Sequence, residues 1–342
     1  MINKESGVSN IKNPIAACID LGSSYFRLLV VDRSRMGGPS ELTPLLEERI
    51  YIGWGRCLQE DGIITPGEAE NALRALRRLV EDSAGAGCDS PVIVATNTLR
   101  NAVNAKQTTA MLEHGISLPV EILSQDEEAA LSFAGVSSGT GGGHSSIVID
   151  AGGTSTEIVW GVDGTIKGSA GIQLGTHGVR SRMPRGNLRR FSFRSCRDPV
   201  RNTADFIREQ LDHFKGSQDF AGGKLSFLPP GGERPKIIFT GGTAVSTGIL
   251  ARFMAGSRSV MCESTVMTTR GFDLVRRRVR YAFESGRERF FPLEAERRDL
   301  LLPGLALMKG VLDLILADTF HVVARDLRWA VVTRENGRID TR

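Results

Sequence analysis

CIDLGSSYFRLLVVD, at residues 18–32, is the most informative stretch of this chain, and SIVIDAGGTSTEIVWG, at residues 146–161, repeats its pattern. Each runs from an apolar strand through Asp, one further residue and Gly into a short turn with small hydroxyl side chains, and then into a second apolar strand. Such a turn points successive backbone N–H groups into one concavity that suits a phosphate group. Glycine lets the backbone approach closely, and Ser and Thr add hydroxyl donors. Two such turns, at the start of two similar halves, predict a phosphate held between two domains.

Length and composition are those of an ordinary globular protein. The 342 residues suit two domains, and 41% hydrophobic with 24% charged residues is an average balance. The net charge of +4 is too small to indicate nucleic acid, so no specific nucleic acid partner is expected. The five cysteines are scattered and never form a CxxC pair, which argues against a disulfide framework or a zinc site and predicts a reducing cytoplasm.

No segment of the sequence indicates secretion or a membrane partner. Residues 1–13 form a polar N-terminal extension without an apolar signal core. The longest apolar stretch, LLLPGLALMKGVLDLILA at 300–317, contains Pro303, Lys309 and Asp313. We therefore expect a buried or amphipathic helix there rather than a membrane span.

The remaining pattern predicts an α/β fold. After the first turn we expect a strand up to Asp32, a third strand near 45–52, and a helix that starts at Pro66 with Thr65 as its N-cap. Three further stretches predict a strand that leads into a helix or a Gly-rich turn: 92–105, 121–136 and 237–247. A Gly- and Ser-rich linker is expected at 137–146. This order, restarted once, predicts two domains with mixed sheets that face each other across a cleft.

Residues 180–208 differ in composition from the rest of the chain. They carry nine arginines against only Asp198 and Asp205. Two interpretations stay open: a solvated loop and helix face, or a basic surface for a polyanion beside the cleft.

Several common catalytic motifs are missing from the sequence. There is no Walker A pattern, no HExxH, no GxSxG and no cluster of His and Cys residues. The five histidines are isolated, and we expect them to be structural or surface groups. Phosphate chemistry in this chain would therefore depend on backbone amides, carboxylates, Arg and Mg²⁺.

The carboxylates after Ser124 include a candidate general base. Ser124 and Glu127 have the spacing of a capping box, and Asp126 favours the helix dipole, so both acids have structural explanations. Glu128 is not used by the cap and lies at the junction between the two halves. It can take a proton from an attacking water, whereas the alternative is a glutamate that only faces solvent.

Four more side chains are candidates for binding phosphate or metal. Arg100 follows a helix start, where a guanidinium beside free N–H groups can grip phosphate in a bidentate manner, although a surface ion pair is the alternative. Asp20 and Asp150 end the two entering strands and can hold a hydrated Mg²⁺ or orient a water. Glu157 lies on the exiting strand of the second turn, where a metal role through water would explain a carboxylate.

At these residues the chain resembles the Ppx/GppA family of exopolyphosphatases and guanosine pentaphosphate phosphohydrolases, a branch of the actin-like ATPase superfamily. The resemblance covers nearly the whole length, and the stretches that carry it are IDLGS (19–23), ATNTLRNAVN (95–104), ILSQDEEA (122–129), IDAGG with STE (149–157), TGGT (240–243) and LPGLA (302–306). The second and third stretches separate this family from sugar kinases, actins and chaperone ATPases, which share only the two phosphate turns. Residues 333–337 look like an altered form of the family's terminal Leu-Arg-Glu-Gly element.

The resemblance implies an α/β fold of two ribonuclease H-like (actin-like ATPase) domains, with domain I at 14–132 plus 320–342 and domain II at 133–319. It implies that Glu128 is the catalytic base, that Arg100 lies on the phosphate, and that Mg²⁺ is held by Asp150 and Glu157 together with Asp20. Substrate phosphate is expected to contact Gly22, Ser23, Ser24, Gly152, Gly153, Thr154, Ser155, Gly241 and Gly242.

The function that this resemblance implies is Mg²⁺-dependent hydrolysis of phosphoanhydrides in the cytoplasm. The expected substrates are inorganic polyphosphate or guanosine pentaphosphate, with guanosine tetraphosphate as a related ligand. Two other interpretations stay open: a regulator that binds polyphosphate or these nucleotides without hydrolysing them, and a kinase or motor-type ATPase of the same fold. Substrate preference, chain-length preference and oligomeric state, including a homodimer, also stay open.

Two departures from the family pattern fall in the phosphate turns. The Asn-Ser that usually follows Gly-Ser is here Ser24-Tyr25, and the third glycine of the second turn is Thr154. Tyr25 is bulky for a position near phosphate, and Thr154 restricts a turn in which glycine most easily takes φ > 0. We therefore expect altered affinity, substrate choice or catalysis.

Overall fold

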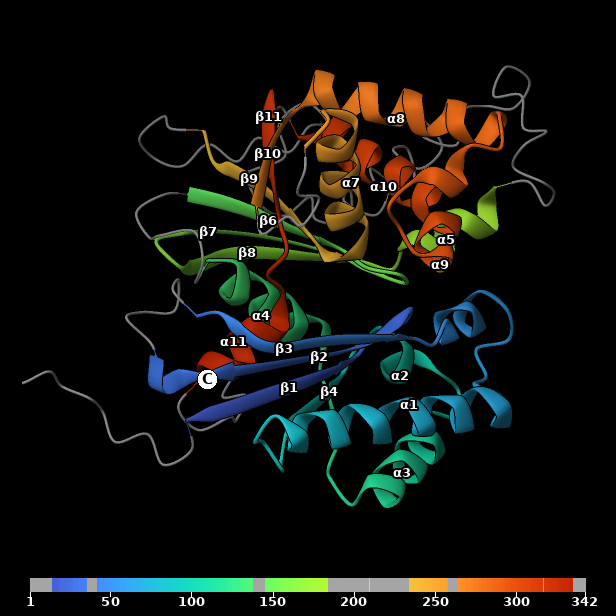
Figure 1. Ribbon diagram of the computed structural model, residues 1–342, viewed down its shortest axis with the longest axis vertical. Helices are drawn as coiled ribbons and strands as arrows, with labels where there is room; N and C mark the ends of the chain where they lie inside the picture. Colours follow the sequence, from blue (N-terminus) through green and yellow to red (C-terminus); the bar gives the residue numbers. More distant parts are fainter. Residues whose placement is uncertain are drawn as a thin grey trace, which may run out of the picture.

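The computed structural model describes residues 14–35, 42–137, 145–183, 234–257, 264–315 and 317–334, and the single residue Glu209. Two β-sheets, each covered by helices, lie one above the other in Figure 1. The first sheet is built from the N-terminal part of the chain, and the second from the part after residue 144. The predicted arrangement of two mixed sheets is confirmed.

The first sheet has the strand order β3-β2-β1-β4-β5, in which β1, β2 and β3 are antiparallel neighbours and β4 and β5 run parallel to β1. Its strands are β1 (Ile15–Leu21), β2 (Tyr25–Asp32), β3 (Pro44–Tyr51), β4 (Val92–Ala95) and β5 (Glu121–Ile122). The segments that accompany it are η1 (Arg33–Arg35), η2 (Trp54–Gln59), α1 (Pro66–Gly85), α2 (Asn97–Asn101) and α3 (Ala105–Ile116). The N-terminus of α1 forms the predicted capping box, because the Thr65 side chain accepts from Glu68 N and the Glu68 side chain accepts from Thr65 N.

The second sheet has the order β10-β11-β9-β6-β7-β8. Its strands are β6 (Ser145–Ala151), β7 (Thr156–Val162), β8 (Thr165–Ile172), β9 (Lys236–Thr240), β10 (Ser264–Thr268) and β11 (Thr319–Val323). Its helices are α5 (Thr176–Arg182), α7 (Gly241–Met254), α8 (Thr269–Glu284), η4 (Glu288–Phe290), α9 (Ala295–Asp299) and α10 (Leu301–Leu314). The apolar stretch at 300–317 forms the expected buried helix, since α10 packs against α5, α7 and α8.

Two helices lie between the sheets. These are α4 (Gln125–Ser137) and α11 (Leu327–Thr333), which pack on each other. Helix α4 also contacts β6, β7 and β8 of the second sheet, whereas α11 contacts β1 and β2 of the first, as Figure 1 shows. The chain therefore crosses from one sheet to the other through α4 and returns through α11.

The return to the first sheet starts later than the segment 320–342 that the sequence analysis groups with domain I. Strand β11 pairs with β9 and β10 of the second sheet, where Phe320 is fully buried against Phe239 and Phe272. Within the described residues of this segment, α11 contacts β1 and β2 of the first sheet. The domain boundaries themselves stay a prediction.

Two segments singled out in the sequence lie largely outside the described residues. The linker is described only at its ends, and of the arginine-rich segment only residues 180–183 are described, at the end of α5. In the described part of the chain, no helix is both long enough and apolar enough to cross a membrane.

Candidate active site

A cavity of about 920 Å³, open to solvent, lies between the two sheets and is lined by both predicted phosphate turns. A third Gly-rich turn, formed by Gly241 and Gly242 at the start of α7 just after β9, also lines the cavity. The predicted site residues that line the cavity are Asp20, Gly22, Ser23, Ser24, Glu128, Asp150, Gly152, Gly153, Thr154, Ser155, Glu157, Gly241 and Gly242. The fold thus brings together residues that are up to 222 positions apart in the sequence (242 − 20).

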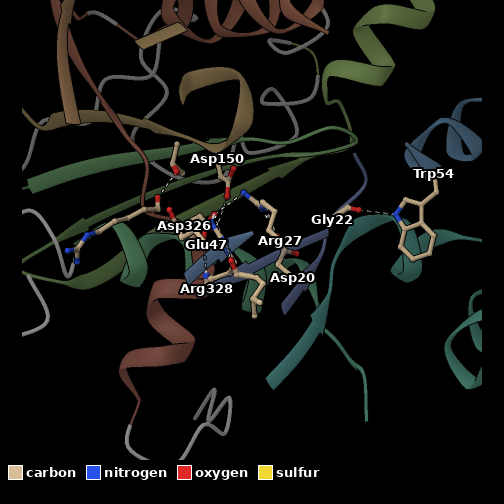
Figure 2. A network of polar contacts seen from close by, with 12 residues as sticks. Asp20, Gly22, Arg27, Glu47, Trp54, Asp150, Asp326 and Arg328 are labelled. Atoms are coloured by element: carbon tan, nitrogen blue, oxygen red, sulfur yellow. Dashed lines mark hydrogen bonds and ion pairs between the residues drawn. The ribbon is translucent and has the colours of Figure 1, made fainter. Parts of the chain in front are cut away.

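The first turn, between β1 and β2, is fixed by the segment that follows β3. The Trp54 indole donates a hydrogen bond to the Gly22 carbonyl at 2.9 Å (Figure 2), and Gly55 N donates to the Ser23 carbonyl at 2.9 Å. Trp54 is fully buried and packs edge-to-face on Phe26 of β2. These hydrogen bonds fix the backbone of the turn, whose Ser23 and Ser24 line the cavity.

The second turn, between β6 and β7, is closed by its own backbone and by the start of α5. Gly152 N donates to the Ser155 carbonyl at 3.0 Å, and Thr176 N donates to the Gly152 carbonyl at 3.1 Å. The expected strain at Thr154 is absent, because Thr154 does not take φ > 0 and neither do Gly152 and Gly153. A Cβ added to Gly55 would lie 2.8 Å from the Thr154 methyl carbon, so the glycine at position 55 makes room for this side chain. The steric objection to Thr154 is therefore wrong.

Glu128 lies on the first turn of α4 and is 7% exposed. Its Oε2 accepts a hydrogen bond from Arg100 Nη1 at 2.9 Å. Burial raises the pKa of Glu128 to about 7 despite the opposing effect of Arg100, and the nearby Asp150 and Asp20 raise it further. The predicted capping box also forms, since Glu127 N donates to Ser124 Oγ and Ser124 N donates to the Glu127 carboxylate. Glu127 thus has the structural contacts, and Glu128 lines the cavity.

Arg100 is not among the residues that line the cavity. Besides Glu128, its guanidinium donates to the Leu123 carbonyl at 2.7 Å and to Asn97 Oδ1 at 3.2 Å. These three acceptors fix the guanidinium next to the Glu128 carboxylate. In this structure Arg100 therefore contacts Glu128 and does not line the cavity in which phosphate is expected.

The other three predicted acids lie deep in the cavity wall. Burial raises the pKa of Asp150 to about 6, and it raises the pKa of Asp20 and of Glu157 as well. Ser132 Oγ donates to Asp150 at 2.9 Å. Asp20 Oδ1 and Glu157 Oε1 are buried without a hydrogen-bond partner among the described residues. Such orphaned oxygens are costly to bury, so a ligand that they could bind would stabilise them.

These acids fit a cation that is bound partly by the substrate. Among the described residues, no three His, Cys, Asp or Glu side chains come together as a ready metal-binding group. Mg²⁺ does not require such a cage, because it usually keeps several waters and binds one or two carboxylates together with substrate phosphates. The unpartnered oxygens of Asp20 and Glu157, together with Asp150, suit that mode of binding.

A buried charge network supports Asp20 and was not predicted from the sequence. Arg27 of β2 lines the cavity and binds both Asp20 and Asp326, the latter at 2.8 Å (Figure 2). Asp326 is the N-cap of α11 and also accepts from Arg328, whose Nη1 donates to the Leu28 carbonyl at 2.9 Å. Burial acts against the charge on Arg27, but Asp326 and Asp20 outweigh it and raise the pKa of Arg27. The network joins α11 to the first sheet beneath the cavity.

A second arginine that the sequence did not indicate also lines the cavity. Arg297 of α9 has its guanidinium carbon 5.6 Å from the centre of the Tyr25 ring and donates to Ser246 Oγ at 3.3 Å. Its Nε is buried without a partner among the described residues, and burial lowers the pKa of Arg297 to about 10. Arg49 and Tyr25 of the first sheet both contact Glu294, which precedes α9. Arg297 therefore brings a positive charge to the cavity wall, where Tyr25 and the nearby Glu294 favour its charged form against the effect of burial.

The model of the Ppx/GppA phosphatase family matches residues 30–337 of this sequence. The chain belongs to that family. An exopolyphosphatase structure from Cytophaga hutchinsonii is similar with a TM-score of 0.80 and 18% identity, over 96% of this chain and 100% of that one. A Ppx/GppA phosphatase structure from Aquifex aeolicus gives a TM-score of 0.69 and 19% identity, over 94% of this chain and 99% of that one. At these identities the structures establish the fold, which is the two-domain fold of the actin-like ATPase superfamily.

The segment 333–337, which the sequence analysis compares with the family's terminal Leu-Arg-Glu-Gly element, does not reach the cavity in the part that the structure describes. Thr333 and Arg334 do not line the cavity, and residues 335–337 lie outside the described residues. The Leu-Arg pair that the fold brings to the site is Leu327–Arg328, since Leu327 lines the cavity and Arg328 belongs to the buried network beneath it. Chemically, the site combines four buried carboxylates of raised pKa, two turns that carry backbone N–H groups, and two arginines in the cavity wall, Arg27 and Arg297. Carboxylates, backbone N–H groups and arginines are the parts needed to transfer a phosphoryl group to water.

Proposed function

We propose that this protein is a Mg²⁺-dependent phosphoanhydride hydrolase that releases the terminal phosphate from inorganic polyphosphate, guanosine pentaphosphate, or both. The observation that carries the proposal is the placement of Glu128, a buried carboxylate whose pKa is about 7, in a cavity lined by both phosphate turns. A general base is most effective when its pKa lies near the working pH. A much higher pKa would leave it protonated, and a much lower pKa would make it too weak a base to take a proton from water. Membership of a phosphatase family supports the same reaction class.

In the proposed reaction, Glu128 takes a proton from a water that attacks the terminal phosphorus. The bond from that phosphorus to the bridging oxygen breaks, so the products are inorganic phosphate and a chain or nucleotide shorter by one phosphate. Backbone N–H groups of the two turns and the guanidinium of Arg297 stabilise the negative charge of the transferred group. Asp20, Asp150 and Glu157 would hold Mg²⁺, which supplies positive charge to the phosphate oxygens. Arg100 holds the carboxylate of Glu128 in place.

One assay distinguishes this proposal from its alternatives. Phosphate release is measured from long-chain polyphosphate, guanosine pentaphosphate and ATP side by side, with Mg²⁺ and with excess chelator. Release from polyphosphate or the pentaphosphate that requires Mg²⁺ supports the hydrolase. Binding of both without release would indicate a non-catalytic regulator, and turnover confined to ATP would indicate a kinase or motor-type ATPase.

The cell compartment and the assembly state are further parts of the proposal. A reducing cytoplasm agrees with Cys18, Cys57 and Cys88, which are free cysteines. A homodimer remains a proposal that sedimentation of the full chain would test.

A further inference from the structure

His177 is a buried histidine at the point where the two phosphate turns meet. It lies on the first turn of α5 and is 4% exposed. Its Nε2 is 2.9 Å from Ser24 Oγ, and Ser24 is the cavity-lining residue that replaces the family's usual Asn. The two residues are 153 positions apart in the sequence, so this hydrogen bond links the first sheet's turn to the second domain.

The backbone of His177 is itself fixed to the second turn. Its N–H donates to the Gly153 carbonyl at 2.8 Å. A Cβ added to Gly153 would collide with the hydroxyl groups of Ser23 and Ser24 and would lie 3.1 Å from His177 Cδ2. The two turns are therefore in contact, and the imidazole bridges from the second turn to a hydroxyl of the first. Such a rigid support removes the rotational freedom that a serine hydroxyl otherwise has.

The protonation state of His177 decides whether His177 could activate Ser24 as a nucleophile or only hold its hydroxyl by a hydrogen bond. Burial lowers the pKa of His177 to about 4, and the neighbouring charge of Arg56 lowers it further. The imidazole is therefore neutral near pH 7, and it is too weak a base to activate Ser24 as a nucleophile. A neutral imidazole can still donate from Nε2 when the proton is on that nitrogen. Phosphate oxygens only accept hydrogen bonds, so a bound phosphate selects the tautomer that leaves the Ser24 hydroxyl hydrogen for the phosphate.

We propose that His177 is a positioning residue, which donates from Nε2 to Ser24 Oγ and so presents the Ser24 hydroxyl as a donor to a substrate phosphate oxygen. This inference rests on the proposed function only in that a phosphate occupies the cavity. It assigns a role at the site to one of the histidines that the sequence analysis expects to be structural or surface groups, and it explains how Ser24 can serve where the family has Asn.

The test is a double-mutant cycle on binding, so that it does not require turnover. The probe is imidodiphosphate with Mg²⁺, in which a bridging nitrogen resists hydrolysis, and affinity is measured by calorimetry. The variants are Ser24→Ala, His177→Leu, their combination, and His177→Gln, whose amide can donate from nearly the position of Nε2. Ser181→Ala is the matched control, because its hydroxyl lies on the same helix and contacts Gln59 and the Gly178 carbonyl. Circular dichroism and thermal unfolding of each variant report on folding.

We expect Ser24→Ala to weaken binding about tenfold, the usual loss for one hydrogen bond to a charged group. His177→Leu should weaken it about fivefold in the parent but less than about twofold in the Ser24→Ala background, while His177→Gln and Ser181→Ala stay within about twofold of the parent. Equal effects of His177→Leu in both backgrounds would overturn the proposal, because the histidine would then act independently of Ser24. A parent chain that fails to bind the probe would also overturn it. A parent that binds the probe but releases no phosphate from any substrate would instead count against the hydrolase alone.

Discussion

Replacing Glu128 by Gln is expected to affect both catalysis and the pH dependence of stability, and the second effect can be calculated from the site. Gln keeps the shape and can still accept from Arg100, but it cannot take a proton from water. Turnover should therefore fall by about 10²–10⁴-fold, the usual share of general-base catalysis, with little change in KM. Glu127→Gln is the matched control, because Glu127 caps α4 and its loss should mainly cost about 1 kcal/mol of stability.

The sign of the stability effect follows from the direction of the pKa shift. The pKa of Glu128 rises from its ordinary 4.5 to about 7 on folding, so the folded protein keeps a proton that the unfolded chain releases between these values. The stabilisation from this group is complete below the lower value and is lost as the pH rises through the higher one. Between about pH 5.5 and about pH 8 this amounts to about 2 kcal/mol in the free energy of unfolding.

Urea denaturation at both pH values measures this change in the parent and in Glu128→Gln. The parent should lose about 2 kcal/mol more than the variant between about pH 5.5 and about pH 8, because the variant has no group at position 128 to titrate. Equal losses would show that Glu128 does not carry the raised pKa. A control variant at Glu127 that lost turnover while Glu128→Gln kept it would refute the assignment of the base.

Three further outcomes are expected. Arg100→Gln removes a positive charge that lowers the pKa of Glu128. The acidic limb of the pH profile of kcat/KM should therefore move up by about one pH unit. An acidic limb that stays in place would contradict the idea that Arg100 acts through Glu128. Gly175→Ala would place a Cβ against the backbone of the second turn and should lower the free energy of unfolding by about 2–4 kcal/mol with loss of phosphate binding, whereas unchanged urea denaturation would contradict this close approach. Asp326→Asn leaves the buried Arg27 with one carboxylate fewer and should cost about 3 kcal/mol near neutral pH. Because Arg328 and Arg27 hold the pKa of Asp326 below its ordinary value, that cost should shrink as the pH falls through the lowered pKa, and urea denaturation that shows the same cost at acid pH would argue against it.

Local signals were sufficient for much of the fold. The capping boxes at Thr65–Glu68 and Ser124–Glu127 each depend on residues three positions apart, so the sequence alone places the starts of α1 and α4. The phosphate turns are equally local, and they line the cavity as expected. Strand β11 was harder to place, because its apolar residues fit either sheet until the partners of Phe320 are known.

The site residues that could not be predicted from the sequence depend on contacts between residues far apart in the chain. Arg27 binds Asp326, 299 positions away, and no spacing rule connects them. His177 stands alone in the sequence, and only the meeting of the two turns gives it a partner. Tyr25 shows the limit of an argument from size: its ring lies edge-on to Tyr51 and beside the guanidinium of Arg297, in contacts that bulk alone does not predict.

The position of α11 also has a consequence for the order in which the protein is synthesised and folded. Strands β1 and β2 are synthesised long before α11, yet one of their two buried faces packs on α11, and the Leu28 carbonyl accepts a hydrogen bond from a side chain 300 residues later in the chain. Helix α4, which separates the two sheets, likewise lacks its partner until α11 has been made. All strands of the second sheet thus precede α11 in the chain, so this face of β1 and β2 stays uncovered until the second sheet has been synthesised. Until α11 has been made, this apolar face is open to contacts with other chains.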